Sequence, residues 1–418
     1  MAPNVAETGF EEPLLTPPNA TTAAPRQRAG KDAAKAAKAA KPKAAVLPLE
    51  NPPFTVGDLK RAIPARCFQP TLVESFTHVA IDLVWLAAGW AAILAADAAI
   101  VALPLPALVA VPLRIAAWAV YAFLQGVTMT GLWVIAHECG HGGFSLHDWV
   151  NDAVGFVLHT ALYVPYFAWQ RSHSNHHHYT SNLQKDEVFV PAKAEVDANG
   201  NVVAPKTPKN PIVVTGYLIG VLLFGWPLYL LIDATSHKRD SFANHFLPSS
   251  SIFKPNDYWK VVASNLGLVA WTGVLVYLGN LIGSGLLLRL YLPPLLVTNG
   301  FLVAITFLQH TDNTLPHYDD EEWTWLRGAL CTVDRTMGRW LDKRLHYIHS
   351  THVAHHVFSR IPFYRAEEAT AALAKTLGPY YNITDENFLV SLYRNFRDCV
   401  ALEPGRGILY FVEQHLSD

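Results

Sequence analysis

Charged residues and cysteines are both scarce in this chain. Only 16% of its 418 residues are charged, while 51% are hydrophobic, and the formal net charge is -2. Soluble domains carry about 25% charged residues, so this composition favours a membrane protein. The near-neutral balance gives no sign of a nucleic-acid partner. The spacing of the four cysteines fits neither a disulfide framework nor a zinc ribbon; they are Cys67, Cys139, Cys331 and Cys399.

Two pairs of long apolar segments occur in the sequence. Residues 79–103 and 107–135 each exceed the roughly 20 residues that cross the hydrocarbon core of a bilayer. The turn between them is too short to hold a domain, so the two segments form a helical hairpin. Residues 258–280 and 291–309 form a second hairpin. We therefore predict an all-α integral membrane protein with four transmembrane helices.

Two further segments are predicted to be interfacial or re-entrant. Residues 152–170 are amphipathic, rich in aromatic side chains and interrupted by Pro165, as is typical of an interfacial helix. Residues 213–234 are apolar, but the basic residues at 238–239 follow them, and the positive-inside rule places these in the cytosol. We therefore expect 213–234 to enter the membrane without crossing it, or to lie along it, with an interruption near Pro227.

The polar parts of the chain complete the domain organisation. They carry most of the Lys and Arg and are predicted to form a cytosolic helical cap within a membrane domain of residues 51–390. Residues 1–50 are rich in Pro and Ala and poor in large apolar side chains, which predicts a disordered tail. Residues 391–418 are predicted to be a C-terminal cytosolic tail, so both termini lie in the cytosol.

Histidine is unusually clustered, because 11 of the 19 histidines lie in windows 137–141, 173–178 and 346–356. The first window holds HxxxH and the other two hold HxxHH, spacings that align the imidazoles on one face of a helix. One zinc ion takes only three or four ligands, so eight imidazoles indicate two metal ions with positions open for oxygen or substrate. The predicted ligands are His137, His141, His173, His176, His177, His352, His355 and His356.

Two other classes of protein stay open at this point. The segment from His137 through Glu138 to His141 also matches the HExxH pattern of zinc proteases, in which the glutamate is the general base. Such a protease leaves the two HxxHH clusters without a role. A metal transporter is the other alternative, although transporters place their polar ligands within the spans.

The three clusters resemble the three histidine boxes of membrane fatty-acid desaturases. The second box reads HSNHHH, with an extra histidine at His178. Neighbouring segments resemble the microsomal oleate (delta-12, omega-6) desaturases of plants and fungi, and the likeness runs from about residue 50 to about residue 382. Omega-3 desaturases, hydroxylases, acetylenases and conjugases look alike in these segments and stay alternatives. The segments are 53–60, 164–169, 225–230, 305–311, 315–318 and 325–330.

This resemblance implies an activity and its partners. A di-iron centre would use O2 to place a cis double bond at delta-12 of an oleoyl chain, giving a linoleoyl chain. The acyl chain would be linked to phospholipid or to CoA, in the endoplasmic reticulum membrane. The sequence lacks the His-Pro-Gly-Gly motif of a fused cytochrome b5 domain. Electrons are therefore expected from NADH through cytochrome b5 reductase and a separate cytochrome b5. A homo-oligomer is compatible with the sequence.

Further site residues are predicted near the boxes. His310 follows the last apolar segment and is a candidate ninth ligand, as the resemblance to desaturases with an additional histidine implies. It can join the site only if 213–234 does not cross the membrane. Glu138, Asp186 and Asp312 lie close in sequence to predicted ligands and are candidates to orient them by hydrogen bonds.

Overall fold

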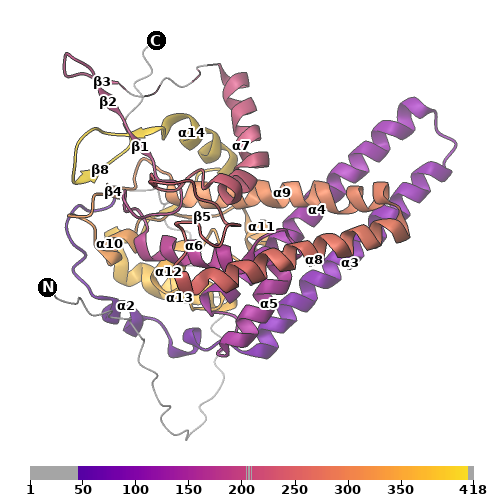
Figure 1. The fold of residues 1–418 in the computed structure, drawn as a ribbon, viewed down its shortest axis with the longest axis horizontal. Helices are drawn as coiled ribbons and strands as arrows, with labels where there is room; N and C mark the ends of the chain where they lie inside the picture. Colours follow the sequence, from indigo (N-terminus) through magenta and orange to yellow (C-terminus); the bar gives the residue numbers. More distant parts are fainter. Residues whose placement is uncertain (1–45, 204, 206–207, 209, 413–418) are drawn as a thin grey trace, which may run out of the picture. The chain divides into compact units, whose positions relative to one another are not determined.

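The structure is a computed structural model that describes residues 46–203, 205, 208 and 210–412. All of these residues belong to one compact unit, and most of them are helical, as predicted (Figure 1). Residues 1–45 of the predicted N-terminal tail lie outside the described residues.

The first predicted hairpin is formed by α3 (Leu72–Ala102) and α4 (Ala107–His141). The hydroxyl of Thr71 accepts a hydrogen bond from the backbone N–H of Glu74 and so begins α3. At 1.5 Å per residue, helices of 31 and 35 residues are longer than the roughly 30 Å hydrocarbon core. The inner end of α4 therefore reaches past the apolar layer and carries the first histidine box.

The second predicted hairpin is formed by α8 (Tyr258–Ile282) and α9 (Ser284–His310). The turn between them is made at Gly283, whose φ of +90° lies in the region that favours glycine. Both hairpins extend to the same side of the shorter helices (Figure 1). Helix α9 packs closely on α4 and ends at His310, so the last residue of a long apolar helix is a predicted ligand.

Helix α7 (Pro211–Ile232) differs from the prediction in one respect. We expected an interruption at Pro227, but α7 continues through this residue to Ile232. A proline removes one backbone donor, whereas a full break in an apolar setting would leave several backbone groups without partners. Within the described residues, five helices are long and apolar enough to span a membrane, and α7 is one of them. It runs across the direction of α8 and α9 in Figure 1.

Shorter helices form the cap that holds the remaining boxes. Residues 152–170 fall in α5 (Asp148–Thr160) and α6 (Tyr166–Tyr179), with the expected break at Pro165. The third box lies on α12 (His352–Val357), which packs on α13 (Phe363–Leu377). The other helical elements are α2 (Val56–Ala62), η1 (Ala65–Phe68), η2 (Pro255–Asp257), α10 (Trp325–Ala329), α11 (Arg339–Arg344), η3 (Gly378–Tyr380) and α14 (Phe388–Asp398).

Strands of two residues join distant parts of the cap in pairs. The pairs β1–β7 and β5–β6 are parallel, and the pairs β2–β3 and β4–β8 are antiparallel. Through β7 and β8, residues that we assigned to a C-terminal tail pair with strands of the domain, and α14 packs on α7 and α9. The strands are β1 (Ala192–Lys193), β2 (Glu195–Val196), β3 (Val202–Val203), β4 (His317–Tyr318), β5 (Asp334–Arg335), β6 (Ile383–Thr384), β7 (Ala401–Leu402) and β8 (Ile408–Leu409).

Gly126 sets the distance between α4 and α9. A Cβ atom at this position would lie 2.4 Å from Cγ1 of Val297 and 3.0 Å from the carbonyl oxygen of Pro294. The hydroxyl of Thr298 donates to the carbonyl oxygen of Gly126 at 3.1 Å, so the two helices also share a hydrogen bond. Because α9 carries His310, this contact fixes one predicted ligand relative to the first box.

We predict that Gly126→Ala lowers stability, because the added methyl group forces α4 and α9 apart. Overpacking of this kind costs about 1–3 kcal/mol. The thermal unfolding midpoint of the detergent-solubilised protein should fall. Gly216→Ala on α7 is the matched control, since a Cβ there meets no atom within 4 Å. Equal midpoints for the two variants would contradict the prediction.

Candidate metal centre

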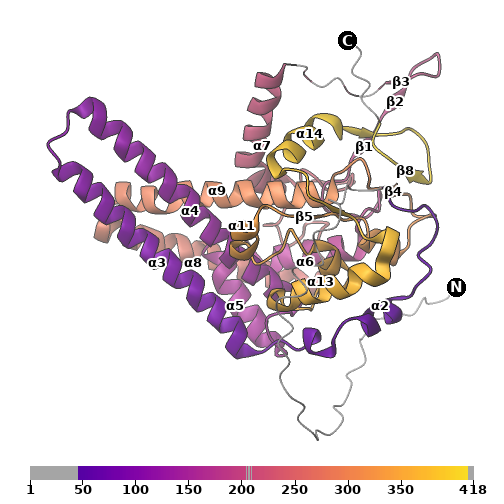
Figure 2. The ribbon, with the colours of Figure 1, turned by 180° about the vertical axis from the view of Figure 1, so that it is seen from behind.

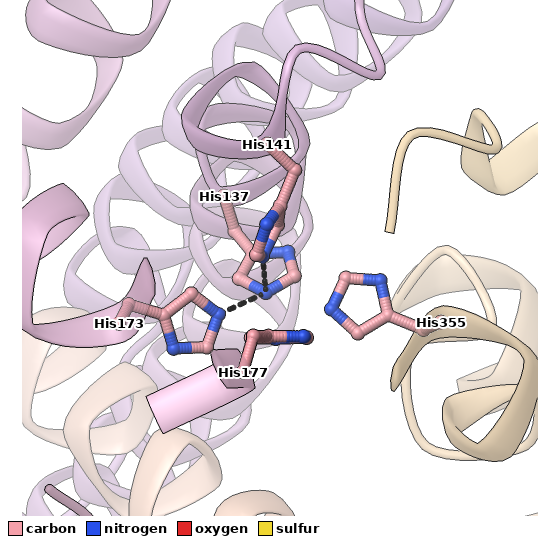
Figure 3. A group of neighbouring side chains, drawn as sticks. All are labelled: His137, His141, His173, His177 and His355. Atoms are coloured by element: carbon pink, nitrogen blue, oxygen red, sulfur yellow. Dashed lines mark hydrogen bonds between the residues drawn. The ribbon is translucent and has the colours of Figure 1, made fainter. Parts of the chain in front are cut away.

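Five histidines from three helices form the first cluster. Helix α4 contributes His137 and His141, α6 contributes His173 and His177, and α12 contributes His355, and their rings converge in Figure 3. One ligand atom from each lies within 4.8 Å of all the others. The i, i+4 spacing on α4 and on α6 points both rings of each helix the same way. A single ion could therefore reach ligands from all three helices.

A second cluster lies beside the first. Ligand atoms of His176, His310 and His356 lie within 4.8 Å of one another. His352 adjoins them, with its Nε2 atom 3.0 Å from Nε2 of His310. The two clusters touch where the ring of His177 stacks on that of His356, at 4.1 Å between centroids. All nine histidines that we predicted as ligands are thus brought together as two groups.

The chemistry of these rings fits metal ions. Both ring nitrogens of His177 and the Nε2 atoms of His355 and His356 are buried without a hydrogen-bond partner among the described residues. Buried polar atoms rarely lack partners, and a bound metal ion would supply a partner to one nitrogen of each ring. Burial, reinforced by neighbouring imidazoles, holds the pKa of His173, His177, His355 and His356 well below the usual value. The rings are therefore neutral near pH 7, which is the form that binds metal.

Hydrogen bonds from the far side of the rings fix the second cluster. The Nδ1 atom of His176 donates to Asp186 at 2.6 Å, and the other oxygen of Asp186 accepts from the backbone N–H of Ser181 at 2.7 Å. The hydroxyl of Thr180 lies 3.2 Å from Nδ1 of His356. Contacts of this kind set the tautomer and the direction of a ligand ring. Asp186 therefore lies on the outer side of the His176 ring, in the position from which a carboxylate would orient it.

Glu138 lies between the first and third boxes. One of its oxygens is 3.3 Å from Nδ1 of His137 and 3.8 Å from Nδ1 of His355, and the side chain is buried. The opposite nitrogen of His137, Nε2, faces His141 at 3.3 Å and His173 at 2.8 Å (Figure 3). Glu138 is therefore on the outer side of the ring. This favours a role in orienting ligands over that of a general base acting on metal-bound water.

Asp312 differs from our prediction, because its carboxylate contacts none of the histidines in the described part of the chain. It is paired with Arg335 and accepts hydrogen bonds from Thr314. Arg335 in turn donates to the carbonyl oxygen of Leu308 at 2.9 Å, close to the end of α9. Proximity in sequence to His310 was misleading, because α9 ends at that residue and the chain then turns away.

Asp334 was missed by the sequence analysis. Its carboxylate accepts the backbone N–H of Val353 at 2.9 Å and the hydroxyl of Tyr381 at 2.8 Å, and so fixes the start of α12. Burial raises the pKa of Asp334 to about 7, although these hydrogen bonds oppose the rise. No local pattern connects this residue to the third box, which begins 18 residues later in the sequence.

Neighbouring aromatic and histidine side chains define the limits of the site. The ring of Trp133 stacks on His137 at 5.6 Å and that of Trp169 stacks on His173 at 4.6 Å, so both form an apolar wall. His178, the extra histidine of the second box, is exposed and belongs to neither cluster. The register of that box is therefore the one that uses positions 173, 176 and 177.

Comparison with known proteins agrees with this geometry. The model of the family described as "Fatty acid desaturase" matches residues 115–386, a range that contains both histidine clusters. The chain is 44% identical to an omega-6 fatty acid desaturase, endoplasmic reticulum isozyme 1, of Glycine max, over 86% of this chain and 89% of that protein. It is 40% identical to a delta(12) fatty acid desaturase of Mortierella alpina, over 86% and 91%. A delta(12) acyl-lipid conjugase (11E,13E-forming) of Impatiens balsamina is 42% identical, over 86% and 91%.

These matches decide between the classes of protein that the histidine patterns left open. A zinc protease would use one box and a transporter would bind metal inside the spans, whereas the family match contains all three boxes. Long apolar helices and buried histidine clusters agree with a multi-pass membrane enzyme that acts on fatty acyl chains. This chain belongs to the fatty acid desaturase family, and it is an oxidoreductase.

Proposed function

We propose that this protein is a delta-12 desaturase that converts oleoyl chains to linoleoyl chains. The observation that carries the proposal is the pair of adjoining imidazole clusters. Relatives over 86% of the chain are named omega-6 or delta(12) desaturases, which supports this regiochemistry. Two iron ions, when bound, would supply the activation of O2. The reaction removes two hydrogens from the acyl chain and, with two electrons and two protons, reduces O2 to water.

The protein's own residues would hold, orient and shield this centre. The nine histidines supply neutral ligands, so the charge of the metals is not offset by carboxylates within the ligand set. Asp186 and Glu138 keep the rings of His176 and His137 directed inward. Trp133 and Trp169 form an apolar wall beside the first cluster and exclude water from it.

The contacts of α7 support a topology of four spans with both termini in the cytosol. Leu218, in the first half of α7, packs with Leu308 near the inner end of α9. The hydroxyl of Tyr229, near the end of α7, donates to Ser172 on α6 at 3.0 Å. Both halves of α7 thus contact helices that carry predicted ligands. A helix lying along the membrane surface satisfies these contacts, and α3, α4, α8 and α9 then form the spans.

An endoplasmic reticulum location and cytochrome b5 as the electron donor complete the proposal. Relatives of Glycine max and Brassica juncea are named as endoplasmic reticulum enzymes. On α11, Arg339 and Lys343 are exposed and lie close in sequence to the third box. An acidic partner would be drawn to these charges. Arg335 and Arg344 do not serve this purpose, because they are paired with Asp312 and Asp82.

Expression in a host that makes oleate but no linoleate tests the activity. We expect linoleate in its lipids, and none from a His355→Ala variant, which lacks a ligand of the first cluster. Gas chromatography of the acyl chains provides the measurement. Hydroxylated or conjugated products without linoleate would assign the enzyme to those relatives instead. An 18:3 product formed only when linoleate is fed would indicate an omega-3 desaturase.

His310→Ala tests the ninth ligand. Removing this buried ring leaves the second cluster one ligand short, so iron should fall from about two to about one per chain and turnover to about one hundredth or less. His317→Ala is the control, because His317 is also buried but its Nδ1 atom faces Ser181. The measurements are metal analysis of the purified protein and product formation. Wild-type iron content in His310→Ala would remove this residue from the ligand set.

Lys343→Glu tests the docking of the electron donor. Reversing an exposed charge should raise the KM for cytochrome b5 by about threefold to tenfold, and the effect should shrink with added salt. The KM for the acyl substrate should not change. Lys375→Glu, an exposed charge on α13, is the matched control. Equal donor KM values in the two variants would place the docking surface elsewhere.

A further inference from the structure

Asp82 is an acidic residue in the first half of α3, and its immediate neighbours in the sequence are apolar. The surrounding residues, Ala80 to Trp85, are otherwise apolar, yet the carboxylate of Asp82 is completely buried. A charge in a membrane helix is expensive unless it is paired, and such residues commonly serve function. The role of Asp82 can therefore be inferred from the residues with which it is paired.

Both partners come from the segment that leads into the third box. A guanidinium nitrogen of Arg344, Nη2, donates to one oxygen of Asp82 at 2.8 Å. The Nε2 atom of His346 pairs with the other oxygen at 2.7 Å. Arg344 ends α11, which packs on α4 (Figure 2), and box three begins at His352. The carboxylate of Asp82 thus binds two residues that lie just before the three predicted ligands of the third box.

The contact depends on a glycine in α4. A Cβ atom at Gly131 would lie 2.7 Å from the carbonyl oxygen of Arg344 and 3.1 Å from Oδ2 of Asp82. Only a glycine lets this segment approach closely enough for Asp82 to reach it past α4. Gly131 also precedes His137 on the same helix, so box one and the segment before box three meet at this point.

The backbone after Arg344 has an unfavourable conformation that needs stabilising contacts such as the one with Asp82. His346 and Tyr347 have φ values of 51° and 61°, a left-handed conformation that residues other than glycine rarely adopt. Two in succession persist only where surrounding contacts determine them. Asp82 holds His346, and the backbone N–H of Tyr347 donates to the carbonyl oxygen of Asp342 at 2.8 Å.

Hydrogen bonds link this segment directly to the third box. The backbone N–H of Thr351 donates to the carbonyl oxygen of Tyr347 at 3.1 Å, and Nδ1 of His352 pairs with that of Ile348 at 3.2 Å. His346 also lines a small pocket together with Glu138 and His355. A shift of His346 would therefore disturb the ligand His352 through the backbone and change the surroundings of the ligand His355.

We propose that Asp82 is a positioning residue for the metal centre. It fixes the segment from 344 to 348 and thereby aims His352 and His355 of the third box. This inference rests on the proposed two-metal centre. It assigns a role to a residue that touches neither metal ligand nor substrate and lies 55 positions before the first ligand, His137.

The test compares Asp82→Asn with Asp97→Asn in the full-length protein. Asp97 is the matched control, because it is on the same helix and is also ion-paired, with Arg114 at 2.7 Å and 2.9 Å, but at the far end of α3. We expect Asp82→Asn to lower turnover at least about tenfold, and to change the Mössbauer spectrum of the bound iron or reduce the iron per folded chain. Asp97→Asn should keep the iron content, the spectrum and the turnover of the wild type.

A purely structural role would lower the abundance or the unfolding midpoint without altering the iron centre of the molecules that fold. The inference is therefore overturned if Asp82→Asn binds two irons with the wild-type spectrum. If Asp82→Asn does not accumulate, His346→Asn decides, since asparagine tolerates the left-handed conformation but is too short to reach Asp82. The same iron defect supports the inference, and a wild-type centre overturns it. A wild-type protein without iron would instead refute the proposed function.

Discussion

The structure depends on packing nine imidazole rings, seven of them buried, against one another at the inner ends of α4 and α9. A buried polar atom without a partner costs about 1–3 kcal/mol, so several unpaired ring nitrogens are unfavourable until metal ions bind them. Metal binding would therefore stabilise the fold as well as enable catalysis. The rings can meet only because long helices extend beyond the apolar layer and bring their last turns together.

Carboxyl groups on the outer side of the clusters hold the rings and the third box in place. Asp186 fixes His176, Asp334 fixes the start of α12, and Asp82 holds the segment before that helix. None of these carboxyl groups belongs to the helix that it supports. The predicted ligands are neutral rings, and the carboxyl groups stand one layer further out. The metals would thus remain strongly electrophilic while their ligands stay rigid.

Chemistry and regiochemistry are determined at different levels in this family. The two histidine clusters are consistent with the di-metal site of a desaturase, but they do not determine the position of the new double bond. Relatives with about the same identity to this chain include delta(12) desaturases and a conjugase. Small differences in how the acyl chain lies beside the metals can separate these outcomes, because the same centre then removes different hydrogens.

The sequence by itself determined the long apolar helices, the break at Pro165 and the histidines that form the clusters. These features are local: hydrophobic length and the i, i+3, i+4 spacing act within one helix. Only the tertiary structure decided which histidines share a cluster, that Asp312 faces Arg335, and that Asp334 and Asp82 support the third box. It also carried α7 through Pro227 and paired the C-terminal strands with the cap. Apart from the continuation of α7, these outcomes depend on contacts between residues far apart in the chain, which no local pattern encodes.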